Sequence, residues 1–311
     1  MLSRRSVRVK VMQVLYALNR NGLAATPQAA QLYYQRLVDA TYHLYLFNLL
    51  AFQRVVEYAR QDEIRRHSKL RPTEADLAFT AKLANNDYLP TLAKNADFQL
   101  QLSRAKLNNR LDADKVRALY IGFSKQEIYQ DFIAKPHNSH EEYIELYLAL
   151  YKYLINEESF TDMLEDVFPL WQDDKSLVVG AMKKTIKALP LEPNFLEAYQ
   201  PSAETVMEFG RELLHKVLST DAELLDLITP SLKNWDADRV AVLDMIMLKM
   251  AIAEFIYFPS IPTKVTLNEF VDISKLYSTD KSKEFINGIL DRLLRKLTED
   301  KLINKQGRGL A

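Results

Sequence analysis

The chain has 311 residues, in which 41 Lys and Arg balance 41 Asp and Glu, and it has no cysteine. Its length suffices for one large or two ordinary domains, and its apolar content of 48% excludes an intrinsically disordered chain. The lack of cysteine excludes disulfides, thiolate zinc sites and cysteine nucleophiles. The sequence shows neither a signal peptide nor a membrane-spanning apolar run. We therefore expect a cytoplasmic protein.

The charges are unevenly distributed although they balance overall. No acidic residue precedes Asp39, whereas the N-terminal segment carries Arg4, Arg5, Arg8, Lys10, Arg20 and Arg36. A neutral total argues against a basic coat that binds nucleic acid without specificity. A local basic patch on a neutral protein instead indicates a small, targeted RNA contact.

Residues 3–19 are predicted to form an amphipathic helix that Ser3 caps. Its apolar stripe consists of Val7, Val11, Val14, Leu15 and Leu18. We therefore expect the basic residues Arg4, Arg5, Arg8 and Lys10 to project from exposed turns. Cations in a first helical turn oppose the helix dipole at a cost of about 0.3–1 kcal/mol each, so phosphate binding explains them better than stability does. A solvated basic face is the alternative.

The long middle of the chain continues in helical spacing. The sequence has only 7 glycines, which favours an all-α fold. Helices are predicted over 27–67, 73–82, 112–134, 139–155, 160–168 and 176–189. Ser139 and Glu142 are spaced as a capping box at the start of one of them.

The middle carries no recognisable chemistry. His137 and His140 are spaced like metal ligands, but no further ligands accompany them, so we expect loop histidines and no metal site. Placing Trp171 over Trp235 aligns 140–190 with 204–254 and suggests a diverged internal repeat. Helix periodicity alone generates such matches, so duplication and chance similarity both stay open.

The C-terminal third has the strongest helical pattern. A long helix is predicted over 234–258, and Pro259 and Pro262 end it. Two further helices follow, the last of them lined by Phe285, Ile286, Ile289, Leu290 and Leu293. Gly288 lies within this last pattern at a cost of about 1 kcal/mol relative to alanine, so we expect a close neighbour beside it. Such a bundle leaves no place for a buried catalytic group.

Motifs at both ends of the chain resemble the NusB family of transcription antitermination factors. The C-terminal ones are Pro262, Lys264-Val265, Asn268-Glu269, Lys275, Tyr277, Ser282 and the run 285–291, and the N-terminal ones are Arg4-Arg5, Arg8, Gln13, Leu15 and Tyr16. The resemblance covers about 3–20 and 203–297, and the enlarged middle is similar to members of the Bacteroidetes type. It implies an all-α, NusB-like helical bundle made by 1–24 and 203–311, with a large helical insertion over 25–202.

The resemblance also implies roles for individual residues. Arg4, Arg5, Arg8, Lys10 and Tyr16 would bind boxA-like RNA, together with Lys281, Lys283 and Phe285 from the last helix. Core packing is the alternative for Tyr16 and Phe285. Lys281 stands where the family often has an acid, so it would strengthen RNA binding or shift its specificity.

Asp238 and Asp244 are implied to project from exposed turns and to bind NusE, a small-subunit ribosomal protein. An ordinary first-turn anion is the alternative for Asp238. The implied function is antitermination during ribosomal RNA transcription, without a cofactor, in contact with RNA polymerase through the assembled complex.

Two other classes are weighed against this one. An RNA cytosine methyltransferase would need a catalytic cysteine and a cofactor-binding α/β domain, so we expect no enzyme. A non-enzymatic helical interaction protein whose insertion binds another partner stays the alternative.

Overall fold

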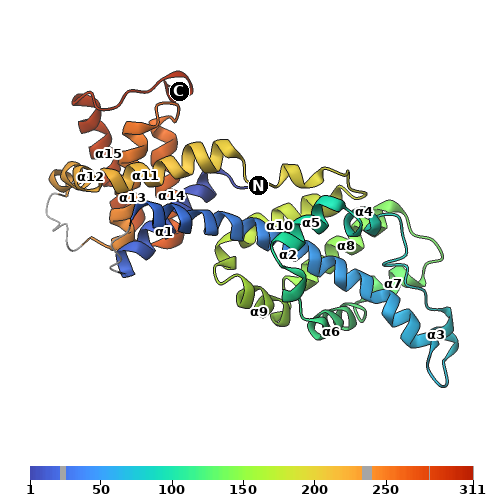
Figure 1. Cartoon of the computed structure of the whole chain (residues 1–311). Coiled ribbons are helices and arrows are strands. Elements are labelled where there is room, and N and C mark those ends of the chain that lie inside the picture. The colour runs from blue at the N-terminus through green and yellow to red at the C-terminus, as the bar shows by residue number, and fades with distance from the viewer. Residues whose placement is uncertain (22–25, 233–239, 280, 311) are drawn as a thin grey trace. The chain divides into compact units, whose positions relative to one another are not determined.

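The computed structural model describes residues 1–21, 26–232, 240–279 and 281–310. These residues form helices and connecting turns, without a β-strand among them, so the predicted all-α fold is confirmed (Figure 1). The chain divides into two compact units. We call Leu2–Val38 with Pro201–Ala311 the terminal unit, and Asp39–Gln200 with Met1 the insertion unit.

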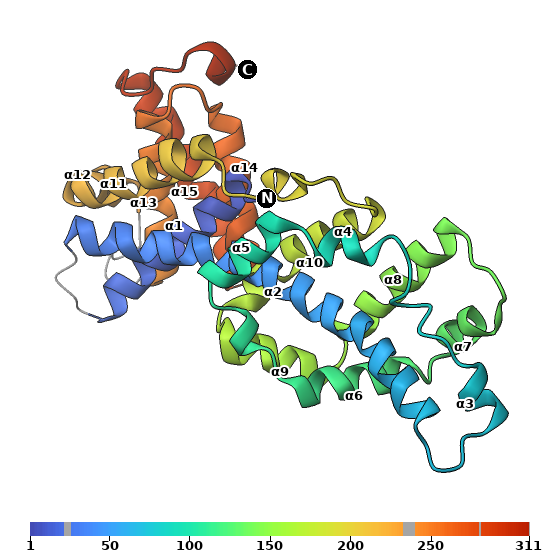
Figure 2. The same ribbon diagram turned by 45° about the vertical axis from the view of Figure 1, so that its right-hand side comes forward.

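The terminal unit joins the two ends of the chain. It comprises α1 (Arg4–Asn21), the start of α2 (Pro27–His67), η3 (Glu204–Arg211), α11 (Glu212–Ser219), α12 (Asp221–Ile228), η4 (Thr229–Ser231), α13 (Val242–Tyr257), α14 (Thr263–Tyr277), α15 (Ser282–Glu299) and η6 (Gly307–Leu310). Helix α1 packs against η3, α11 and α13, and α14 packs against α13 and α15 (Figure 2). The basic N-terminal helix therefore lies within the C-terminal bundle.

The start of α2 belongs to the terminal unit, whereas the sequence predicts a boundary after residue 24. The Tyr34 hydroxyl donates to the Val206 carbonyl at 3.0 Å, and the Gln31 amide donates to the Arg211 carbonyl at 3.0 Å. These contacts tie residues 27–38 to η3. The family resemblance placed them in the insertion, because its matching residues at the N-terminal end stop at about residue 20.

Helix α13 is the central element of the terminal unit. Residues 246–248 and 250–255 of this helix are buried, because α1, α11, α12, α14 and α15 all pack around it. The described helix begins at Val242, and the first part of the predicted 234–258 helix lies outside the described residues. Pro262 caps α14, so the predicted interruption is confirmed.

The insertion unit has a continuous core of its own. It holds the rest of α2 with α3 (Glu74–Ala78), α4 (Leu89–Ala93), α5 (Ala96–Arg104), η1 (Asn108–Arg110), α6 (Ala113–Phe123), α7 (Glu127–Ala134), α8 (His140–Leu154), α9 (Glu158–Val167), α10 (Trp171–Lys187) and η2 (Phe195–Ala198). The predicted capping box of Ser139 and Glu142 is confirmed at the start of α8.

Three predicted helices of the insertion differ from the structure. The helix over 112–134 is wrong: α6 and α7 are separate, because the chain turns at 124–126 and the Gln130 amide bonds the Ser124 carbonyl there. The helix over 73–82 ends at Ala78, where Phe79 turns to an extended conformation and buries its ring. Helix α10 begins at Trp171 instead of Ser176, since burial of the indole extends the pattern.

The internal repeat stays a prediction. The aligned segments do share an order of long, short and long helices: α8, α9 and α10 correspond to η3 with α11, to α12 and to α13. This shared order is consistent with duplication of one three-helix unit, and equally with ordinary helical packing.

Candidate nucleic-acid interface

A buried ion pair holds the N-terminal helix to the centre of the terminal unit. The Arg8 guanidinium donates from Nε and Nη2 to the two Glu254 oxygens, at 2.8 and 2.6 Å. The side chains of Arg8 and Glu254 are 2% and 0% exposed. The Thr266 hydroxyl donates to the same carboxylate at 2.6 Å, so three helices, α1, α13 and α14, meet at one charge pair.

The expectation that Arg8 and Lys10 project from exposed turns is wrong. Both side chains are buried, and so are residues Val7, Val9 and Val11 between and beside them. Sequence reasoning assumed a helix with one covered face. Instead, α1 is enclosed by η3, α11 and α13, so polar side chains also turn inward. Arg8 is there an internal counter-charge, and Lys10 likewise has a partner.

The two preceding arginines are half-exposed and also engaged by carboxylates. Arg5 donates to Glu269 at 2.9 Å and to Asp272 at 2.9 Å, and Arg4 donates to Glu204 at 3.1 Å. The hydrogen bond to Glu269 raises the pKa of Arg5 above its ordinary value. Lys275 and then Arg5 lower the pKa of the Asp272 carboxyl. The arginines therefore form a carboxylate-paired surface instead of a free cationic cluster.

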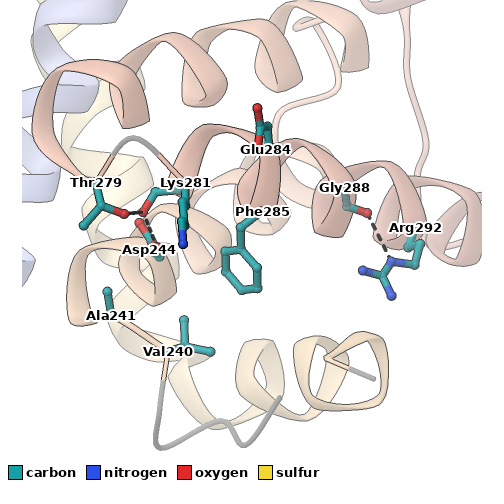
Figure 3. Close-up of a pocket in the computed structure, with 10 residues that line it drawn as sticks. Val240, Ala241, Asp244, Thr279, Lys281, Glu284, Phe285, Gly288 and Arg292 are labelled. Carbon is teal, nitrogen blue, oxygen red and sulfur yellow. Dashed lines mark hydrogen bonds between the residues drawn. The ribbon is translucent and has the colours of Figure 1, made fainter. Parts of the chain in front are cut away.

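A pocket of about 610 Å³ opens beside the start of α15, and several predicted site residues line it (Figure 3). Lys281, Phe285, Gly288 and Arg292 follow at spacings of four, three and four, so they share one face of the helix. Lys283 is exposed but does not line the pocket. The structure thus brings Lys281 and Phe285 together and adds Arg292, which sequence reasoning missed.

Gly288 has no close neighbour among the residues that the structure describes, so the expectation of one is wrong. A Cβ added there would meet no atom of the described chain within 4 Å. The glycine instead lies on the pocket wall between Phe285 and Arg292. Internal packing therefore does not require it.

Asp244 is buried, so the expectation that it projects from an exposed turn is also wrong. Its two oxygens accept hydrogen bonds from the Ser278 and Ser282 hydroxyls, at 2.7 and 2.8 Å. These bonds link α13 to the residue after α14 and to the first residue of α15. Figure 3 shows Asp244 at the base of the pocket, near Thr279 and Lys281. Asp238 lies outside the described residues.

A second pocket of about 470 Å³ lies on the same unit between α1, α11 and α13. It is largely apolar, and the Lys249–Asp221 ion pair at 2.6 Å stands at its edge. Tyr16 is partly buried near the end of α1, with the Arg20 guanidinium 5.8 Å from its ring centre. The RNA contact of Tyr16 stays a prediction.

The sequence contains a signal for the carboxylates that pair with the N-terminal arginines. Glu254 is the single acid in the predicted helix after Asp244, in the middle of an apolar run. A charge at such a position is buried, and a buried charge requires a counter-charge. Glu269 belongs to the Asn268-Glu269 motif, but its partners come from the far end of the chain.

The described residues contain neither a candidate metal site nor a candidate membrane span. The described part of the chain contains no group of three His, Cys, Asp or Glu that could hold a metal ion. No described helix is long and apolar enough to cross a membrane. His140 packs against the Tyr88 ring with centroids 5.1 Å apart.

Comparisons with known proteins give one family. The NusB family model matches residues 170–295. The transcription antitermination protein NusB of Chloroherpeton thalassium is 36% identical over 103 residues, which are 33% of this chain and 49% of that protein. The protein of the same name from Salinibacter ruber is 37% identical over 103 residues, 33% of this chain and 64% of that protein.

A third relative is matched over most of its length. The transcription antitermination protein NusB of Geobacter sulfurreducens is 35% identical over 113 residues, 36% of this chain and 82% of that protein. The chain spans only about half the length of the first relative. NusB proteins are non-enzymatic antitermination factors, in agreement with the expectation from sequence. From the helical fold and these matches together, the chain belongs to the NusB family.

Proposed function

We propose that this protein is an RNA-binding transcription antitermination factor, which binds boxA-like RNA together with NusE during ribosomal RNA transcription. Its membership of the NusB family and its similarity to transcription antitermination proteins support antitermination. The RNA, the NusE partner, the indirect contact with RNA polymerase and a cytoplasmic location are parts of the proposal.

The face of α15 that lines the larger pocket is the observation that carries the RNA assignment. Lys281 and Arg292 stand about 16 Å apart along the helix, from 11 residues at a rise of 1.5 Å each. Phe285 lies between these cations and offers an aromatic surface on which a base can stack. Gly288 leaves room beside that ring. Cations at both ends with an aromatic ring between them suit a single strand of RNA.

The terminal unit has an excess of basic residues and the insertion unit has an excess of acidic residues, which favours RNA binding by the terminal unit. The 41 Lys and Arg divide into 21 in the terminal unit and 20 in the insertion unit, and the 41 Asp and Glu divide into 17 and 24. The terminal unit is therefore net basic within a neutral chain. Long-range attraction of RNA would favour this unit.

Lys281 and Arg292 provide the test of the RNA site. RNA affinity is measured by fluorescence anisotropy with a boxA-like oligonucleotide, with and without NusE, over a series of salt concentrations. Lys281→Asp and Arg292→Ala are expected to weaken binding and to lower the salt slope, by about 0.7 for each lost phosphate contact to a single strand. Arg295→Ala is the matched control, because Arg295 is on α15 but does not line the pocket.

Equal affinities and salt slopes for all three variants would remove the RNA site from α15.

For the N-terminal helix, Arg4 and Arg5 stay proposed RNA contacts because their side chains are half-exposed. Arg8 and Lys10 are proposed to support that helix from within. Asp238 stays the proposed NusE contact, and Asp244 is proposed to act indirectly, through its hydrogen bonds to Ser278 and Ser282.

The interaction-protein alternative rests on a specific observation. The insertion unit has its own continuous core and divides from the terminal unit as a compact body. A unit of this kind is able to present a binding surface without disturbing the NusB-like bundle. Loss of a partner other than RNA or NusE on changing the insertion surface would support this function.

A further inference from the structure

A loop of the insertion unit concentrates positive charge that no neighbour balances. Residues 104–110 read Arg-Ala-Lys-Leu-Asn-Asn-Arg, which we call the basic loop. The Arg104, Lys106 and Arg110 side chains are exposed and form no ion pair or hydrogen bond with any residue that the structure describes. This cluster of cations differs from the insertion unit as a whole, which has more acidic than basic residues.

Five other cations of the same unit are paired with carboxylates, whereas the three cations of the basic loop are clustered within seven residues. Carboxylates engage Arg54, Arg65, Arg66, Lys69 and Lys135 at 2.5–3.1 Å. Two acids that flank the basic loop in the sequence have other partners. Asp97 accepts from the Gln101 amide, and Asp112 caps α6 through the backbone N–H groups of Asp114 and Lys115. No carboxylate within the loop competes for its cations.

The backbone of the basic loop is held in place by its own contacts. Leu107 is buried between the exposed residues, and its N–H bonds the Leu102 carbonyl at 3.0 Å. Lys106 has a left-handed φ of 54°, at a helix end where glycine is the usual residue. The Arg110 N–H bonds the Leu107 carbonyl at 3.0 Å. An ordered loop loses little backbone entropy on binding, so its charges are already positioned for a ligand.

The helix dipole accounts for only part of this charge. A cation in the last turn of α5 is stabilised there, which explains Arg104 and in part Lys106. Arg110 lies beyond that turn, in η1, where the dipole of α5 does not favour it. Asn108 and Asn109 are also exposed, and they add hydrogen-bonding amides to the same surface.

We infer that the basic loop is a second contact surface for RNA, which binds phosphates of the strand outside the boxA-like element. The chemistry favours RNA over an acidic protein, because the loop has no exposed large apolar side chain to form the centre of a protein interface. Repeated phosphates need only cations, with amides for sugars and base edges. This inference rests on the proposed RNA function and gives the insertion a part in it.

The test compares two RNAs on the full chain. One is a boxA-like oligonucleotide, and the other is the same oligonucleotide extended at both ends by unstructured sequence. The triple variant Arg104→Ala/Lys106→Ala/Arg110→Ala is compared with Lys125→Ala/Lys152→Ala/Lys183→Ala, which removes three exposed cations elsewhere in the insertion unit. Far-ultraviolet circular dichroism and thermal melting verify that both variants fold as the unchanged protein does.

The unchanged protein is expected to bind the extended RNA more tightly than the short one. The basic-loop variant is expected to lose about tenfold in affinity for the extended RNA, with a salt slope lower by about 2, and to bind the short RNA normally. The control variant is expected to bind both as before. Equal losses in the two variants, or an equal loss for both RNAs, would overturn the inference.

Three further outcomes separate this inference from its alternatives. An unchanged protein that binds the short and extended RNAs equally refutes the second surface and leaves the proposed function intact. An unchanged protein that binds neither RNA refutes the proposed function itself. If the basic-loop variant loses binding to polyglutamate and keeps its RNA affinity, the surface belongs to an acidic protein and the RNA inference is wrong.

Discussion

Single residues at the centre of the terminal unit act mainly through charge pairing. Glu254 accepts from Arg8 and Thr266, and Glu269 lies between Arg8 and Arg5, at 3.5 and 2.9 Å. Residues that carry the family resemblance at the two ends of the chain are therefore partners of one another. A substitution at one of them is expected to act on stability or on RNA according to its burial.

Arg8→Ala is expected to lower the free energy of unfolding of the terminal unit by about 3–5 kcal/mol, since it leaves the Glu254 carboxylate buried without a counter-charge. Urea denaturation followed by circular dichroism measures this. Arg4→Ala is the control and is expected to change stability by less than about 1 kcal/mol, because its ion pair is exposed. A stable Arg8→Ala protein that has lost only RNA binding would contradict the structural role.

Asp272→Asn is expected to raise RNA affinity. The Asp272 carboxylate engages both Arg5 and Lys275, so phosphate must compete with it for these cations. The amide keeps the size of the side chain but removes the competing charge. Anisotropy at low salt, where exposed charges are least screened, measures the change. Glu299→Gln removes one exposed charge from the far end of α15 as the control, and weaker binding by Asp272→Asn would show that the carboxylate positions Arg5 productively instead.

At the scale of elements, two glycines in the same unit have opposite surroundings. Gly210 in η3 lies where a Cβ would come within 1.9 Å of the Tyr34 hydroxyl oxygen and 2.5 Å of a Val7 methyl. It thus permits α1 and the start of α2 to approach η3. Gly288 on α15 faces the open pocket. The first glycine serves packing, and the second leaves space.

Gly288→Ala is expected to stabilise α15 by up to about 1 kcal/mol, because alanine is the better helix former and its Cβ meets no atom of the described part of the chain within 4 Å. The same change narrows the pocket and is expected to weaken RNA binding. Gly210→Ala is expected to destabilise the unit, since Tyr34 and Val7 must move. Thermal melting and anisotropy on both variants separate the effects, and a Gly288→Ala protein with unchanged RNA affinity would remove Gly288 from the site.

At the scale of the whole molecule, one neutral chain combines a basic unit with an acidic one. Helix α2 belongs to both units, since residues 27–38 pack in the terminal unit and residues 39–67 in the insertion unit. The insertion unit buries its own core, so it does not depend on the NusB-like bundle for apolar burial. Its basic loop is the exception to its acidic character and is where we place its share of the RNA contact.

The sequence by itself determined the elements and the family. Helical spacing, the capping box of Ser139 and Glu142, and the prolines at 259 and 262 act within a few residues, so local rules suffice to find them. The run 285–291 likewise indicated the NusB family before any fold was known. The boundaries at 78 and 124–126 were missed because tertiary burial and side-chain bonds, not propensity, end those helices.

Only the tertiary structure decided which charged side chains are exposed and which are buried. Arg8 and Glu254 are 246 residues apart in the chain, and periodicity describes a helix against its own axis, not against its neighbours. Periodicity therefore predicted that Arg8, Lys10 and Asp244 are exposed. Because other helices pack on several sides of α1 and α13, these side chains are buried instead. Whether a cation meets a carboxylate or open water depends on which helix lies opposite, and that is a property of the assembled bundle.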